Sequence, residues 1–253
     1  MTLKPFALLL SLLLMASTVV RADDDDTPGK NRASIYTQLA AEYLRRGQLS
    51  VALDDIQRAM EADPKWPAAR SVAGLIFYQM QDYASAQKQF QEALRLAPED
   101  PDANHNYGWF LCERGKAQDG IAYFLTAAKN PLYATPEKSL IKAGDCTAKG
   151  GDLEGARLFY LQALKARISS PLARQQLIEL DLKRNDVPEA RRYMTELQKL
   201  VQPSAALAWL ALRVERAAGE KDGEARYADL LRKAYPDAPE TARLLNNQYD
   251  AAE

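Results

Sequence analysis

Residues 33–64 read ASIYTQLAAEYLRRGQLSVALDDIQRAMEADP, and this stretch decides the fold. Apolar side chains recur three and four positions apart on both sides of Gly47, as they do on the buried face of a helix. A glycine between two such runs ends the first helix, and Pro64 ends the second. Ala40 and Ala52 stand where two antiparallel helices would approach closely. The stretch therefore predicts a tightly packed helical hairpin.

The same pattern recurs every 34 residues. Units that begin at residues 33, 67, 101 and, two residues late, at 137 carry small residues at positions 8 and 20, namely Ala40 and Ala52, Gly74 and Ala86, Gly108 and Gly120, and Gly144 and Ala156. A bulky residue stands at position 24 of each unit: Ile56, Phe90, Phe124 and Tyr160. A period of 34 with these positions is typical of tetratricopeptide repeats (TPRs), helical hairpins that stack into a superhelix.

The later units follow the pattern less closely. A fifth unit from residue 171 keeps Leu177 and Ala190, and a sixth from residue 205 is degenerate. Residues 240–250 have the mixed composition of a short capping helix. We predict an all-α protein without strands, a right-handed TPR superhelix of about six hairpins. Its expected units are 33–66, 67–100, 101–134, 137–170, 171–204 and 205–238, with a C-terminal cap and tail at 239–253.

The N-terminus has the pattern of a secretory signal peptide. Lys4 precedes an apolar run from Pro5 to Val20, and a small-residue cleavage pattern follows at Val20-Arg21-Ala22. The run is shorter than the ~20 residues that a bilayer span needs, which disfavours an uncleaved anchor. We expect a signal peptide at 1–22, cleaved after Ala22, and an acidic flexible linker at 23–32.

The nearly equal numbers of basic and acidic side chains exclude binding driven by the net charge of the whole protein. Thirty-three basic and 34 acidic side chains give a formal net charge of −1. A nearly neutral chain does not attract nucleic acid or an anionic membrane as a whole. Any recognition must therefore be local.

Two motifs go beyond the repeat pattern. They are NYGWFLC at residues 106–112 and NPLYATP at residues 130–136, the second inside the insertion between units three and four. With them the chain resembles the PilW/PilF family of type IV pilus biogenesis and stability proteins, from about Ala33 to the C-terminus. The resemblance implies a protein that acts by binding, either helping the pilus secretin to reach the outer membrane and multimerise or otherwise stabilising pili.

One feature of that family is missing. Its members usually end the signal peptide with a lipobox cysteine, whereas residues 19–23 here read VVRAD. We therefore expect a soluble periplasmic form, peripheral to the outer membrane, whose membrane association is only indirect.

The two cysteines lie 34 residues apart on the first helices of units three and four. Neighbouring repeats place these helices side by side, and an oxidising compartment favours disulfides. We predict a bridge between Cys112 and Cys146, the alternative being two buried free thiols.

The sequence offers no enzyme site. His105 lies seven residues before Cys112, about 10 Å along a helix and too far for a thiol and its base. A metal site from Asp102, His105 and Cys112 lacks the paired spacing of zinc ligands. Neither a glycine-rich phosphate loop nor a nucleophile elbow is present. We predict no catalytic residues, no metal, no cofactor and no small-molecule substrate.

The binding surface is expected on the first helices of the first three units, which line the concave face of a TPR superhelix. Its residues are Leu44, Arg45, Leu75, Tyr78, Gln79, His105, Trp109 and Glu113. This mixture of aromatic and apolar groups with few charges suits an amphipathic or extended apolar segment of a protein. The alternative is that Tyr78 and Trp109 only pack against neighbouring helices.

These observations predict a monomeric, non-enzymatic periplasmic TPR adaptor that supports type IV pilus biogenesis or stability. Its expected partner is the outer-membrane secretin or another pilus assembly component, with no nucleic acid. The alternative is a TPR scaffold for another secretion or assembly complex of the cell envelope.

Overall fold

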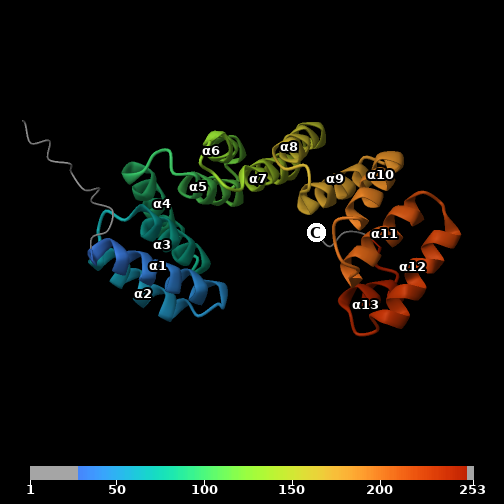
Figure 1. Cartoon of the computed structure of the whole chain (residues 1–253), viewed down its shortest axis with the longest axis horizontal. Coiled ribbons are helices and arrows are strands. Elements are labelled where there is room, and N and C mark those ends of the chain that lie inside the picture. Colours follow the sequence, from blue (N-terminus) through green and yellow to red (C-terminus); the bar gives the residue numbers. More distant parts are fainter. Residues whose placement is uncertain (1–27, 250–253) are drawn as a thin grey trace, which may run out of the picture.

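The computed structural model describes residues 28–249, and within that range helices joined by short turns make up the chain, without a strand. Twelve helices form six consecutive pairs that build an open arch, and a short thirteenth helix follows them (Figure 1). The first three pairs are α1 (Pro28–Arg45) with α2 (Leu49–Ala62), α3 (Pro67–Gln79) with α4 (Tyr83–Leu96), and α5 (Pro101–Glu113) with α6 (Ala117–Lys129). The last three are α7 (Pro136–Lys149) with α8 (Leu153–Ala166), α9 (Pro171–Lys183) with α10 (Val187–Gln198), and α11 (Ala205–Ala217) with α12 (Lys221–Ala234), before α13 (Pro239–Leu245). The predicted all-α TPR superhelix is confirmed.

The helices of a pair approach closely because small and large side chains are matched across them. A Cβ added to Gly74 of α3 would lie 2.7 Å from Cε1 of Phe90 on α4. Gly144 of α7 faces the ring of Tyr160 on α8 in the same way. The bulky residue at position 24 therefore occupies the space that the missing side chain at position 8 leaves free.

The first helix is longer than the sequence indicates. Residues 28–32 were assigned to the flexible linker, but α1 begins at Pro28, so this part of the prediction is wrong. A Cβ on Gly29 would lie 2.8 Å from the backbone oxygen of Ala62, which shows that the added turn packs against the end of α2. The predicted signal peptide and residues 23–27 lie outside the described residues.

The insertion forms an ordered turn between α6 and α7. The Asn130 side chain donates from Nδ2 to the backbone oxygen of Glu99, at 2.8 Å, and accepts from the Leu132 amide at 2.9 Å. Asn130 thus links the turn after α6 to the turn between α4 and α5.

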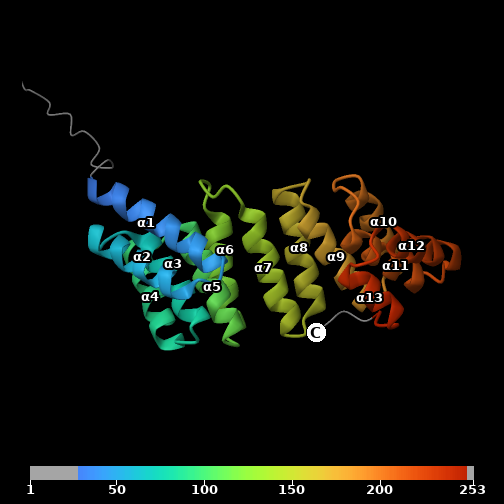
Figure 2. The same cartoon turned by 90° about the horizontal axis from the view of Figure 1, so that it is seen from below.

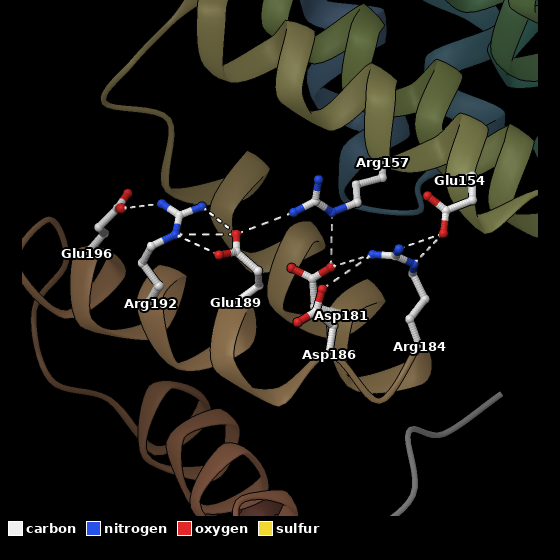
Figure 3. A network of polar contacts seen from close by, with 8 residues as sticks. All are labelled: Glu154, Arg157, Asp181, Arg184, Asp186, Glu189, Arg192 and Glu196. Carbon is white, nitrogen blue, oxygen red and sulfur yellow. Dashed lines mark hydrogen bonds and ion pairs between the residues drawn. The ribbon is translucent and has the colours of Figure 1, made fainter.

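A polar network joins the fourth and fifth pairs (Figure 3). Asp181 of α9 has no exposed surface, and its Oδ1 accepts from Arg157 Nε of α8 at 3.2 Å and from Arg184 Nη1 at 3.1 Å. Arg157 also reaches Glu189 of α10, and Arg184 reaches Glu154 of α8. Burial raises the pKa of Asp181, and its hydrogen bonds to the arginines act in the opposite direction. The network therefore links the fourth and fifth pairs by ion pairs between oppositely charged side chains.

The last helix covers the C-terminal end of the arch. Thr241 of α13 donates from Oγ1 to the backbone oxygen of Tyr235 at 2.6 Å, and Leu244 is buried against α11 and α12. A short helix of this kind covers the apolar face that the last pair would otherwise expose. Along residues 28–249 no helix combines the length and the apolar character that crossing a membrane requires.

Candidate functional site

An aromatic cluster lies between the second and third pairs. The rings of Tyr78 on α3 and Trp109 on α5 meet edge to face, with centroids 4.5 Å apart. Phe110 of α5 lies 6.1 Å from Tyr78, and Leu75 packs against the same cluster. Tyr78, Trp109 and Leu75 are half-buried, so each leaves part of its apolar surface open to solvent. We call Leu75, Tyr78 and Trp109 the aromatic surface.

Charged groups border the aromatic surface on its C-terminal side. Glu113 of α5 accepts from Lys149 Nζ of α7 at 3.3 Å, and the Arg114 guanidinium lies 4.0 Å from the ring centroid of Tyr83. Burial raises the pKa of the Tyr78 hydroxyl, and the nearby Glu113 carboxylate adds to the effect. Tyr78 therefore stays neutral at ordinary pH and offers both a donor and an acceptor.

The remaining predicted contact residues do not join this cluster. Leu44 packs in a separate core with α2 and α3, and Arg45 is exposed and bound to Glu42, with Nη2 2.7 Å from Oε1. Gln79 directly follows Tyr78 at the end of α3 and is exposed, so it borders the aromatic surface without packing in it. The structure thus brings together Leu75, Tyr78, Trp109 and Glu113 and leaves the first helix apart.

His105 lies between units rather than on an open face. Its Nδ1 is 2.8 Å from Ser139 Oγ of α7, and its ring meets Phe124 edge to face at 5.5 Å. Burial, with smaller contributions from Lys142 and Lys138, lowers the pKa of His105 to about 4. His105 is therefore neutral at neutral pH and links the third and fourth pairs through its contact with Ser139.

Acidification is expected to destabilise the chain through this residue. The pKa of His105 is below its ordinary value of 6.5 in the folded state, so the unfolded chain binds the proton more tightly. Stability from this group is complete above pH 6.5 and is lost as the pH falls toward 4. Between pH 7 and pH 5 we expect the free energy of unfolding to fall by about 2 kcal/mol. Denaturant titrations at both pH values measure this change.

The matched variant is His105→Gln, which keeps a hydrogen-bonding side chain but does not titrate. The difference between wild type and variant should shrink as the pH falls from 7 to 5. A difference independent of pH would show that His105 titrates alike in both states.

Cys112 and Cys146 form the expected disulfide. The bridge joins α5 to α7, with the two Cα atoms 5.9 Å apart, and both residues are buried. Neither sulfur is a free thiol, so the pairing of His105 with Cys112 as base and nucleophile fails on chemistry as well as on distance. Within the described part of the chain, no group of three or more His, Cys, Asp or Glu residues could hold a metal ion.

A hollow in the C-terminal half was missed by sequence reasoning. It has a volume of about 330 Å³ and is lined in part by Glu179 of α9, Trp209 and Arg213 of α11, and Arg243 of α13. Arg213 Nη1 donates to Glu179 Oε1 at 2.6 Å, while Glu179 Oε2 is buried without a hydrogen-bond partner in the described structure. Three helices far apart in sequence contribute to it, and no local motif marks such a site.

Comparison with known proteins agrees with the fold and adds a biological context. Residues 72–136 match the tetratricopeptide repeat family. The chain is 24% identical over 238 residues to the type IV pilus assembly protein PilF of Pseudomonas aeruginosa, across 91% of this chain and 94% of that protein.

Two solved structures superpose over most of the chain. The crystal structure of PilW, described as a widely conserved type IV pilus biogenesis factor, matches with a TM-score of 0.73 and 30% identity, covering 84% of this chain and 98% of PilW. A structure of Pseudomonas aeruginosa PilF matches with a TM-score of 0.70 and 21% identity, covering 87% of this chain and all of that one. At that lower identity the second match shows the shared fold alone.

Proposed function

Since the chain belongs to the PilW/PilF family of TPR proteins of type IV pilus biogenesis, we propose that it is a non-enzymatic periplasmic adaptor that binds the pilus secretin and aids its assembly. The proposal includes export by residues 1–22, with cleavage after Ala22. The observation that carries it is the aromatic surface, where large side chains stay partly exposed on a helical scaffold. Half-exposed aromatic residues of this kind are the usual anchors of protein interfaces.

The partner segment is inferred from the chemistry of that surface. Leu75, Tyr78 and Trp109 offer apolar area, and the Tyr78 hydroxyl and the Trp109 indole N–H add hydrogen-bonding atoms. Glu113 and Lys149 at the border already neutralise each other. The surface therefore suits an amphipathic or extended apolar segment of the secretin better than a highly charged one.

Replacing both aromatic residues is expected to weaken capture of the secretin. For Tyr78→Ala with Trp109→Ala, we expect affinity in a pull-down titration to fall by about tenfold or more, because the anchors carry most of the binding free energy. Leu158→Ala on α8, which removes exposed apolar surface from an outer helix, is the matched control and should bind normally.

A second variant tests the same surface in case the double alanine variant does not fold. Gln79 and Glu113 are both exposed, so Gln79→Arg with Glu113→Arg changes the border of the surface without opening a cavity. We expect this folded variant to lose affinity as well. If both variants keep the helical circular dichroism of wild type and also its affinity for the secretin, the proposed site is rejected.

Crosslinking in living cells separates this proposal from a scaffold of another envelope complex. A photo-reactive residue at position 79 should link to the secretin or to another pilus component, identified by mass spectrometry. Recovery of components from a different secretion or assembly complex would favour the alternative.

A further inference from the structure

The two most exposed large apolar side chains of the described structure lie on one edge of the arch. They are Leu132, 90% exposed in the turn between α6 and α7, and Ile168, 81% exposed in the turn between α8 and α9. Leu200, less exposed, lies in the turn between α10 and α11. Figure 2 shows these three turns in a row along the upper edge of the molecule. We call Leu132, Ile168 and Leu200 the apolar tips.

The apolar tips are held in place by hydrogen bonds. The Leu132 amide donates to Asn130, whose side chain also donates to Glu99 of the preceding unit. The Ile168 carbonyl accepts from Arg174 Nη1 at 2.6 Å, and Arg174 is itself buried. A polar side chain thus fixes the backbone at each of the two most exposed tips, which present their apolar groups to water on ordered turns.

Lysines accompany every tip. Lys129 ends α6 before Leu132, Lys165 lies in the last turn of α8 before Ile168, and Lys199 directly precedes Leu200. Each is exposed, and none forms an ion pair with another residue of the described range. Cations at helix C-termini are favourable in any helix. That effect explains the lysines but not the apolar side chains beside them.

Acidic groups on the same edge gather near Leu132. Glu99 lines a hollow together with Lys129 and Leu132, and Asp102 lies within electrostatic range of Lys138 at the start of α7. Asp100 lies beside Asp102 and adds a third carboxylate, and Glu137 at the start of α7 is paired with Arg167. Residues 165–170 and 199–204, which carry the other two tips, contain no acidic side chain, so Lys165 and Lys199 give these two turns a local positive charge.

We propose that this edge is a peripheral binding surface for an anionic phospholipid bilayer. Apolar side chains that protrude beside lysines insert at the level of the headgroups, while the ammonium groups meet the lipid phosphates. Single tips spaced one per repeat fit a flat surface. A protein partner is instead usually met by a contiguous, well-packed cluster such as the aromatic surface. The edge and the aromatic surface use different residues, so the chain can hold both ligands at once.

Vesicle sedimentation tests the proposal. The chain is purified after export, with its mass confirming loss of the leader, and mixed with vesicles of phosphatidylglycerol and phosphatidylethanolamine or of phosphatidylcholine alone. We expect sedimentation with the anionic vesicles that weakens as salt is raised. Leu132→Ser with Ile168→Ser should reduce the bound fraction by about fivefold, since the inserted apolar area is lost.

Two further variants give the test its controls. Lys129→Glu with Lys165→Glu should abolish the preference for anionic vesicles. Leu158→Ser removes another exposed apolar side chain, 62% exposed on α8 and away from the turns, and should bind as wild type does. The serine and glutamate changes lie at exposed positions, so the variants are expected to fold.

Several outcomes would overturn the proposal. Equal sedimentation of wild type and the double serine variant, or none with anionic vesicles, would show that the edge does not bind lipid. If the variant only abolishes self-association in analytical ultracentrifugation, the edge is an interface between copies. If it only abolishes capture of the secretin, the edge docks a protein.

Discussion

Gly120→Val is expected to lower the free energy of unfolding by about 4 kcal/mol, because the change forces two backbones apart. A Cβ at residue 120 on α6 would lie 2.6 Å from the backbone oxygen of Gly108 and 3.1 Å from the amide nitrogen of Cys112, both on α5. Backbone atoms cannot rotate away as a flexible side chain can. The third pair must therefore open, and the disulfide and the aromatic cluster are anchored on its first helix.

The matched control for this change is Ala122→Val. Ala122 is exposed on the same helix, so the variant makes a β-branched substitution without a steric conflict. We expect it to cost only about 0.5 kcal/mol of helix propensity. Denaturant unfolding followed by circular dichroism measures both variants. Similar losses for the two would show that the close approach of α5 and α6 is not as tight as the structure has it.

Breaking the disulfide is expected to lower the stability by about 3 kcal/mol. The bridge closes a loop of 34 residues in the unfolded chain, and loss of that constraint raises the entropy of the unfolded state. It also spans the insertion, where the regular spacing of the units is interrupted. Cys112→Ala with Cys146→Ala, or reduction of wild type, should therefore shift thermal unfolding to lower temperature.

The double alanine variant also serves as the control for reduction. A reductant should destabilise wild type and leave this variant unchanged. Mass spectrometry of untreated protein should find the two cysteine peptides linked. Alkylation of both cysteines without reductant, or a melting temperature that does not respond to reductant, would contradict the prediction.

The hairpins were predictable because their packing rule acts at fixed spacing. Gly74 and Phe90, or Gly144 and Tyr160, lie 16 residues apart and touch because the turn between two helices has constant length. The turns between paired helices were predictable only in part. Gly47 and Asn185 adopt a positive φ, which glycine and asparagine tolerate well, but in the second unit Gln81 does so, at 63°, with no glycine or asparagine to mark the turn.

The candidate site was predictable only in part. Tyr78 and Trp109 occupy inner-helix positions of neighbouring units, and their contact follows from the stacking of repeats. From its position in the repeat, His105 was predicted to lie on the concave face together with Tyr78 and Trp109. In the structure it is partly buried instead, with its ring against Phe124 and its Nδ1 beside the Ser139 hydroxyl. Its environment depends on α7, which belongs to the next unit and follows the insertion.

By itself the sequence determined the helical hairpins and their order, because these depend on residues at constant separation along the chain. It predicted the bridge between Cys112 and Cys146 but left two free thiols as the alternative, and the structure contains the bridge. Only the tertiary structure decided which exposed side chains share a surface. The buried network around Asp181, the hollow beside Trp209 and the row of Leu132, Ile168 and Leu200 join residues from several units. Their proximity depends on how far each pair rotates against the next, and that rotation is set by the sum of many packing contacts rather than by any local pattern.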